Sequence, residues 1–183
     1  KEYSNSDLEI RLDANGAFGK DEAIEKLKKL SEFSIHSVEQ PIMPKQLQEM
    51  ANICELSPIS IALDEELIGI HSTFERQRAL DIINPHFLII KPSLLGGFKD
   101  SDNWIALAEE RKINWWATSA LESNLGLNAI AQWVSTKKNN LRQGLGTGML
   151  FSNNIESPLE ISKDKIFMNA NKNWDFNFFK KNI

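Results

Sequence analysis

The spacing of the residues that end the expected strands is the feature of this sequence that most constrains its fold. Six apolar segments read as strands, and each of the first five is followed by a segment whose apolar residues recur at helical spacing. The strand-ending residues recur every 25 to 28 positions, and a repeated strand–helix unit of this length is typical of a β/α barrel. They are Asp13, Glu39, Asp64, Lys91, Ser119 and Gly146.

The expected strands are mostly continuous apolar runs, which suits parallel strands covered on both faces. An open doubly wound sheet is the structural rival, but it concentrates polar groups near one switch point rather than at every strand end. The sequence therefore favours the barrel. Strands are expected within residues 8–15, 34–41, 59–66, 87–97 and 113–121, with a weaker sixth within 143–151. Helices are expected within residues 19–33, 44–57, 73–83, 102–112 and 125–136.

Composition and charge narrow the class of protein. The 183 residues suffice for one domain, expected over residues 1–183 with a C-terminal tail from about residue 160. The net charge of -4, from 21 basic and 25 acidic residues, gives no reason to expect a nucleic-acid partner. No apolar run reaches the roughly 18 to 20 residues of a membrane span, so no membrane partner is expected. The single cysteine, Cys54, excludes an internal disulfide and fits a reducing, cytoplasmic setting.

Three successive strand ends carry carboxylates, at Asp13, Glu39 and Asp64. In a barrel these ends meet at one mouth, where three anions would repel one another unless a cation lies between them. Carboxylate oxygens without nearby cysteine or histidine suit a hard divalent cation, most naturally Mg²⁺. Any single acid at a strand end more often caps the following helix. Three at the same phase of the repeat favour a metal site.

Lys91 ends the fourth expected strand, directly after four apolar residues. A lysine whose ammonium stays inside a barrel is poorly solvated, and its lowered pKa would suit it to acid/base chemistry. Alternatively, its long side chain could extend so that the charge reaches solvent. The phase of Lys91 in the repeat favours the functional interpretation.

The segments "RLDAN", "VEQP", "ALDEE", "IIKPSLLGG", "TSALESNLGLNAIAQ" and "GLGTGMLF" follow one another along the chain. In this order and spacing they resemble the enolase superfamily, and the resemblance extends from Leu8 to about Leu159. Within the superfamily, the sequence is most similar to the subgroup that forms o-succinylbenzoate in menaquinone biosynthesis. The resemblance implies a partial TIM-type α/β barrel that holds strands three to eight and lacks the first two strands and the capping domain.

The resemblance also implies roles for individual residues. Asp13, Glu39 and Asp64 would be the Mg²⁺ ligands, and Lys91 would act as a catalytic cation that stabilises an enediolate, or as an acid/base. Other residues would orient the first ligand or bind substrate. These are Arg11, Asn15, Ser119 and the backbone amides of Gly146 and Thr147.

The implied activity is the Mg²⁺-dependent dehydration of a succinyl-hydroxycyclohexadiene carboxylate by a carbon–oxygen lyase. A base removes the proton α to the carboxylate, Mg²⁺ and Lys91 stabilise the enediolate, and loss of hydroxide with a general acid yields the aromatic product and water. Two alternatives remain open. One is an N-acylamino-acid racemase or dipeptide epimerase of the same superfamily, and the other is a barrel fragment without catalytic activity.

The superfamily pattern also places a K-x-K lysine pair on the strand before the first metal-binding aspartate. Twelve residues precede Asp13, and none of them forms this pair. We therefore expect the chain to be the C-terminal part of a longer enzyme and to be inactive alone. Six strands cut from a closed barrel would expose two sheet edges, in residues 8–15 and 144–151. We expect the chain either to self-associate through these edges or to close an incomplete barrel with its C-terminal tail.

Overall fold

The structure is a computed structural model that describes residues 8–177 and divides into two compact units. Within the described residues, the first unit comprises the chain up to Ile90 together with Leu95–Trp115. The second comprises Lys91–Leu94 and the residues from Trp116 onward. Among helices of the described part, none is long and apolar enough to cross a membrane.

Five strands form one sheet in the order β1-β2-β3-β4-β5, so neighbours in the sequence are neighbours in space. The first three pairs in this order are parallel. Parallel neighbours need a crossover connection, and each one here contains a helix. The strands are β1 (Arg11–Asp13), β2 (Ser37–Glu39), β3 (Ser60–Leu63), β4 (Phe87–Ile90) and β5 (Asn114–Ala117). The predicted alternation of strands and helices is thus confirmed over these five units.

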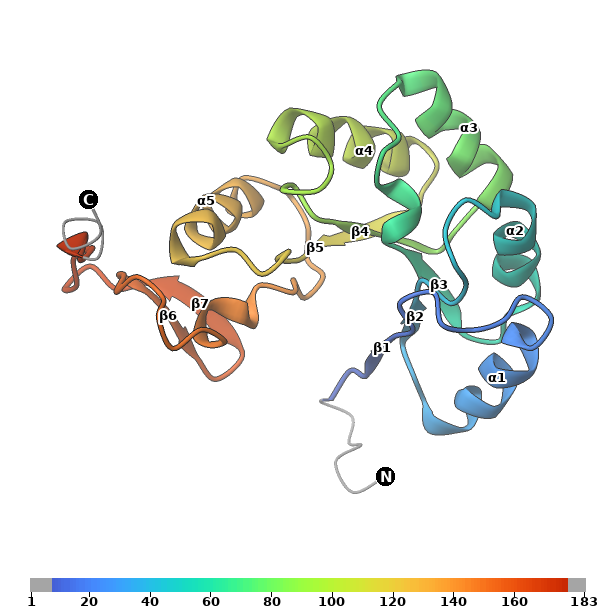
Figure 1. Cartoon of the computed structure of the whole chain (residues 1–183), viewed down its shortest axis with the longest axis horizontal. Helices are drawn as coiled ribbons and strands as arrows, with labels where there is room; N and C mark the ends of the chain where they lie inside the picture. Colours follow the sequence, from blue (N-terminus) through green and yellow to red (C-terminus); the bar gives the residue numbers. More distant parts are fainter. Residues whose placement is uncertain (1–7, 178–183) are drawn as a thin grey trace. The chain divides into compact units, whose positions relative to one another are not determined.

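Figure 1 shows the helices of the first unit following one another along one side of its strands. They are α1 (Ala23–Leu30), α2 (Leu47–Leu56), α3 (Thr73–Ile83) and α4 (Phe98–Glu110), with short 3-10 turns η1 (Ser31–Phe33) and η2 (Glu65–Leu67). Helix α3 has clear end signals in the sequence. The Ser72 hydroxyl accepts a hydrogen bond from the Glu75 backbone N–H at 3.2 Å, and Asn84 ends the helix in the left-handed conformation.

The core of the first unit lies on both faces of the sheet. Consecutive strand residues Ile61, Ala62 and Leu63 are all fully buried, as are Leu88 and Ile89 in the next strand. Successive residues of a strand point to opposite faces, so both faces are covered. Burying each large apolar side chain stabilises the fold by about 1.5–3 kcal/mol. The apolar runs in the sequence therefore reflect burial on both sides, as predicted.

The second unit contains α5 (Asn124–Ser135), the 3-10 turn η3 (Gly146–Met149) and an antiparallel hairpin. The hairpin joins β6 (Leu159–Ser162) to β7 (Lys165–Met168) and lies within the segment expected to be a tail. Leu159 and Ile166 pack against a small core formed by Leu127, Ile130 and Leu145.

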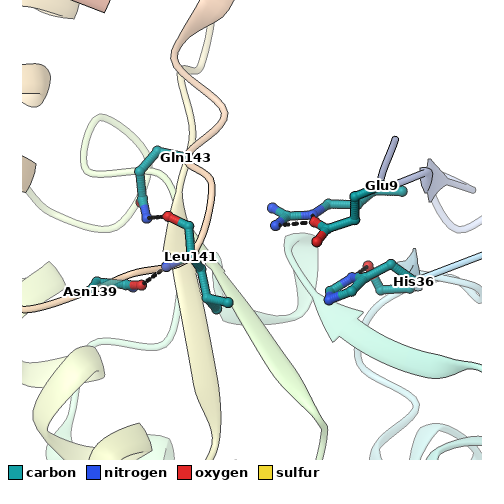
Figure 2. Close-up of polar contacts among 7 residues, drawn as sticks. Glu9, His36, Asn139, Leu141 and Gln143 are labelled. Carbon is teal, nitrogen blue, oxygen red and sulfur yellow. Dashed lines mark hydrogen bonds and ion pairs between the residues drawn. The ribbon is translucent and has the colours of Figure 1, made fainter. Parts of the chain in front are cut away.

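The sixth strand expected within residues 143–151 is wrong. Strand-like pairing is limited to one parallel bridge between Thr118 and Gly144, and the chain then turns into η3. The side chain of Gln143 replaces a strand partner, because its amide oxygen accepts from the Ala117 N–H at 2.7 Å. Figure 2 shows the same loop held by Gln143 donating to the Leu141 carbonyl and by Leu141 donating to Asn139. Beyond this single bridge, a local hydrogen-bond network takes the place of a strand ladder.

Strand β1 stands at one end of the sheet order. Within residues 8–177 its ladder partner is β2, so its other edge has no strand beside it. Association of two copies through this edge stays a prediction. The second sheet edge, predicted within residues 144–151, is not formed by a strand, because residues 146–149 form a 3-10 turn.

Candidate functional site

Three carboxylates follow or end three neighbouring parallel strands of the first unit. In the sheet register Asp13 is the partner of Glu39, and Glu39 is the partner of Ala62. Asp64 comes directly after β3, two residues beyond Ala62. The carboxyl ends of parallel strands meet at one edge of a sheet, so the backbone brings these three residues to the same edge, as predicted.

The three side chains differ in their surroundings. Asp13 is exposed, and its carboxylate accepts from the Asn15 N–H at 2.9 Å. Glu39 is half-buried and Asp64 is 3% exposed. In the part of the chain that the structure describes, no three histidine, cysteine, aspartate or glutamate side chains are placed so that they could hold a metal ion. The donors fit Mg²⁺ in type and in strand register, but as placed their side chains do not form a metal-binding group.

A buried glutamine directly follows the second carboxylate. Gln40 is fully buried, and its φ of 38° lies in the left-handed region. Its amide oxygen accepts from the backbone N–H groups of Asp64 at 3.2 Å and Glu66 at 3.1 Å. Its amide nitrogen donates to the Ile42 carbonyl at 2.9 Å. The end of β2 is thereby joined to the turn that follows β3.

Glu66 is a further buried polar group in this region, with 4% of its surface exposed. One carboxylate oxygen accepts from the Lys45 N–H at 2.9 Å, and the other lies 3.5 Å from the Gln40 amide nitrogen. Burial raises the pKa of Glu66, whereas the hydrogen bonds from Lys45 and Gln40 oppose that rise. Glu66 therefore serves as a hydrogen-bond acceptor inside the loop structure.

Arg11 lies two residues before Asp13 on β1, and its register partner on β2 is Ser37. Its guanidinium makes an ion pair with Glu9 at 2.6 Å, drawn in Figure 2 with Glu9 labelled. His36 contacts the Ser37 hydroxyl at 3.0 Å, and its ring lies 4.9 Å from that of Phe87. Arg11 is thus held by a neighbouring carboxylate, and its predicted contact with substrate stays a prediction.

The remaining predicted residues belong to the second unit. Lys91 directly follows Ile90, the last residue of β4, and its side chain is half-buried. Ser119 is 6% exposed, and its hydroxyl donates to the Glu122 carboxylate at 2.6 Å. The other carboxylate oxygen of Glu122 accepts from the Ser93 hydroxyl. Ser119 therefore holds a carboxylate of its own chain, and the roles of Lys91 and Ser119 stay predictions.

Glu122 is the acceptor at the centre of this small cluster. Burial raises the pKa of its carboxyl, but hydrogen bonds from Ser119, Ser93 and the Ala120 N–H outweigh burial and leave the pKa below its ordinary range. Glu122 is therefore ionised at neutral pH. This acid lies inside the segment "TSALESNLGLNAIAQ", but the sequence does not distinguish its role from that of an exposed loop residue.

Gly146 and Thr147 begin η3. A Cβ added at Gly146 would meet nothing within 4 Å, so no close approach requires glycine there. At Gly144 a Cβ would lie 2.6 Å from the Thr118 hydroxyl oxygen, which explains the glycine at the single bridge. The hydroxyl oxygen of Thr147 is buried without a hydrogen-bond partner in the described part of the chain. Binding of substrate by Gly146 and Thr147 stays a prediction.

Sequence reasoning missed the pair formed by Gln40 and Glu66. The available signal was an amide directly after Glu39 in "VEQP" and a second acid two residues after Asp64 in "LDEE". Neither spacing says whether a side chain turns inward, because that depends on the left-handed conformation at Gln40 and on the strand register.

Known proteins are similar to this chain in sequence and in fold. A family model described as "Enolase C-terminal domain-like" matches residues 1–173. The o-succinylbenzoate synthase of Desulfotalea psychrophila is 55% identical over 159 residues, which are 87% of this chain and 43% of that protein. The L-Ala-D/L-Glu epimerase of Bacillus subtilis is 28% identical over 138 residues, which are 73% of this chain and 36% of that protein. The chain thus spans less than half the length of these curated relatives.

The crystal structure of MenC from Desulfotalea psychrophila LSv54 matches the present structure with a TM-score of 0.87 and 53% sequence identity. The match covers 90% of this chain and 46% of the MenC chain. This likeness confirms the predicted α/β fold as part of a larger barrel.

Proposed function

Because the chain belongs to the enolase C-terminal domain-like family, we propose that it forms the C-terminal barrel part of an o-succinylbenzoate synthase. The observation that carries this proposal is the 55% identity to the synthase of Desulfotalea psychrophila over 87% of the chain. The reaction would be the dehydration of a succinyl-hydroxycyclohexadiene carboxylate to o-succinylbenzoate and water. The enzyme would be a carbon–oxygen lyase of the cytoplasm, a setting that suits the free, buried Cys54.

Asp13, Glu39 and Asp64 would hold Mg²⁺. Their oxygen donors and their positions at the ends of adjacent parallel strands support this assignment. When bound, Mg²⁺ would supply positive charge that lowers the energy of the enediolate formed from the substrate carboxylate. The Asn15 N–H would keep the Asp13 carboxylate oriented through the hydrogen bond already present.

Lys91 would stabilise the negative charge that develops on the substrate when the α-proton leaves. A half-buried lysine suits this role, because charge interactions are stronger where water is partly excluded. Departure of hydroxide, with a proton from a general acid, would complete the loss of water. Arg11, Asn15, Ser119 and the backbone amides of Gly146 and Thr147 are proposed to orient the first metal ligand or to bind substrate.

The base that removes the α-proton is not assigned to this chain, since residues 1–12 contain no K-x-K pair. The chain by itself is therefore proposed to form no product. An epimerase that acts on dipeptides is the second candidate, favoured by the 28% identity to the Bacillus subtilis enzyme over 73% of the chain. The higher identity to the synthase favours the first candidate.

The decisive experiment assays a full-length protein that contains this chain. Purified enzyme with Mg²⁺ should form o-succinylbenzoate, and Asp64→Asn should reduce kcat/KM by roughly 10²-fold or more, as expected when charge stabilisation in the transition state is lost. Asp21→Asn, an exposed acid before α1, is the matched control and should retain activity. Full activity in Asp64→Asn would refute the metal assignment. Dipeptide epimerisation without o-succinylbenzoate formation would refute the synthase.

A further inference from the structure

We propose that Gln40 and Glu66 are positioning residues that set the placement of the Glu39 and Asp64 carboxylates relative to each other. This inference rests on the proposed function, because it takes these two carboxylates as ligands of one divalent cation. It goes beyond that function by assigning a positioning role to two residues that need not touch the cation or the substrate.

The first observation is the backbone of Gln40. The residue directly follows Glu39, is fully buried and has a φ of 38°. Non-glycine residues seldom adopt positive φ, and they do so where the surrounding structure requires it. A buried amide must also find partners for both its oxygen and its nitrogen. The conformation of Gln40 satisfies both demands by directing the side chain toward the turn after β3.

The second observation is what the Gln40 amide binds. Its oxygen accepts from two backbone N–H groups, those of Asp64 and Glu66, at 3.2 and 3.1 Å. The first of these N–H groups belongs to the proposed metal ligand itself. One side chain attached next to Glu39 thus fixes the backbone of Asp64, without an intervening flexible element.

The third observation is that Glu66 contacts both Gln40 and the segment that follows it. Its carboxylate accepts from the Lys45 N–H at 2.9 Å, and the Gln40 nitrogen lies 3.5 Å from its other oxygen. Lys45 has a φ of 70°, so the segment between β2 and α2 is itself held in an unusual conformation. Glu66 therefore ties that segment to the turn after Asp64.

The backbone of Gln40 extends the connection to the third carboxylate. Its N–H donates to the Ala62 carbonyl at 2.9 Å, and its carbonyl accepts from the Gly16 N–H at 2.7 Å. Gly16 follows Asp13 by three residues and has a φ of 70°. Gln40 follows β2 and consequently contacts both the segment after β1, through Gly16, and the segment after β3, through Asp64 and Glu66.

Metal sites depend on such supporting contacts. Groups that hold the ligands are needed to keep them within about 0.5 Å of productive geometry. Loss of such a group lowers metal affinity by roughly 10–100-fold. The same network would also be present in a purely structural role, so the test must separate affinity from stability.

The experiment measures Mg²⁺ binding to the full chain by isothermal titration calorimetry, together with thermal unfolding. Gln40→Met keeps the volume of the side chain but removes both hydrogen-bonding groups, and it is expected to weaken Mg²⁺ binding by about 10-fold or more. Gln46→Met makes the same chemical change in the same loop, where the amide contacts only the Met43 carbonyl among the described hydrogen bonds. Ser72→Ala lowers stability at the α3 cap instead. Both controls are expected to bind Mg²⁺ as the wild-type chain does.

Glu66 supplies a second, independent arm should Gln40→Met fail to fold. Glu66→Gln keeps an acceptor for the Lys45 N–H and should lose less affinity than Glu66→Ala, which removes it. Wild-type affinity in folded Gln40→Met or Glu66→Ala overturns the inference and leaves the proposed function standing. If Ser72→Ala weakens Mg²⁺ binding equally, the loss of affinity follows from lower stability alone, and this result also overturns the inference. A wild-type chain that does not bind Mg²⁺ overturns the metal-ligand assignment itself.

Discussion

Gly16 shows how closely the segment after β1 approaches the segment after β2. Its φ is 70°, and a Cβ added there would lie 3.1 Å from the Met43 Cα. Gly69 has a similar φ of 83°, but a Cβ there would meet nothing within 4 Å. The two glycines therefore separate the cost of a left-handed backbone from the cost of a steric contact.

Gly69→Ala is expected to lower the free energy of unfolding by about 1 kcal/mol, the cost of a left-handed alanine. Gly16→Ala is expected to cost about 1–3 kcal/mol more, because the backbone of Met43 would have to move. Urea unfolding of both variants checks the difference. Equal stability of the two variants would show that the contact with Met43 is not tight.

For single residues, the sequence predicted those that recur at the same phase of the strand–helix repeat. It missed those whose role depends on their backbone conformation. Asp13, Glu39 and Asp64 were predicted because each ends an expected strand at the same phase of the repeat, and the register pairs Asp13 with Glu39 and Glu39 with Ala62. Gln40 was missed because an amide next to a strand end can turn outward as easily as inward. Only its left-handed backbone and its contacts with Asp64 reveal its direction.

Helix α3 is the element whose bounds the sequence predicted most closely. Ser72 and Glu75 form hydrogen bonds at its start, and Asn84 ends it in the left-handed conformation. Ser72→Ala is expected to lower the free energy of unfolding by about 1 kcal/mol, because the Glu75 N–H loses its acceptor. Chemical denaturation measures the loss.

The matched control is Ser31→Ala. The Ser31 hydroxyl donates to the Lys28 carbonyl at the end of α1, and this exposed contact caps no orphan N–H group. Its removal should change stability by less than about 0.5 kcal/mol, as at other surface positions. An equal loss in both variants would argue against the capping role of Ser72.

Elements that depend on local hydrogen bonds were harder to predict. The sixth strand was expected from an apolar, glycine-rich segment, but the Gln143 side chain takes the Ala117 N–H in place of a strand partner. The hairpin of β6 and β7 was overlooked within the presumed tail. Its strands are joined by only Lys163 and Asp164, and a loop of two residues between strands was a usable hairpin signal.

For the whole molecule, two histidines predict a pH dependence of stability. Burial lowers the pKa of His86, whose ring nitrogen accepts from the Ile61 N–H at 3.1 Å. Burial also lowers the pKa of His36; the charge of Glu9 opposes this by a smaller amount, and the charge of Arg11 lowers the pKa further. Between each lowered value and the ordinary value of about 6.5, the unfolded chain binds more protons. The free energy of unfolding should therefore decrease as the pH falls through this window.

Denaturation at pH 7.5 and pH 5.5 measures this decrease. His86→Asn keeps an acceptor for the Ile61 N–H but cannot titrate, so it should reduce the decrease. His71→Asn, at an exposed position, should leave it unchanged. Stability that rises toward pH 5.5 in the wild-type chain would contradict the assignment of these two histidines.

The central claim for the molecule is that three strand-end carboxylates bind one divalent cation. Electron paramagnetic resonance of Mn²⁺ added to the chain measures this directly, because bound and free Mn²⁺ give different signals. We predict one Mn²⁺ per chain, displaced by Mg²⁺, with binding weakened in each of Asp13→Asn, Glu39→Gln and Asp64→Asn and unchanged in Asp21→Asn. A wild-type chain without bound Mn²⁺, or undiminished binding in all three carboxylate variants, would contradict the account.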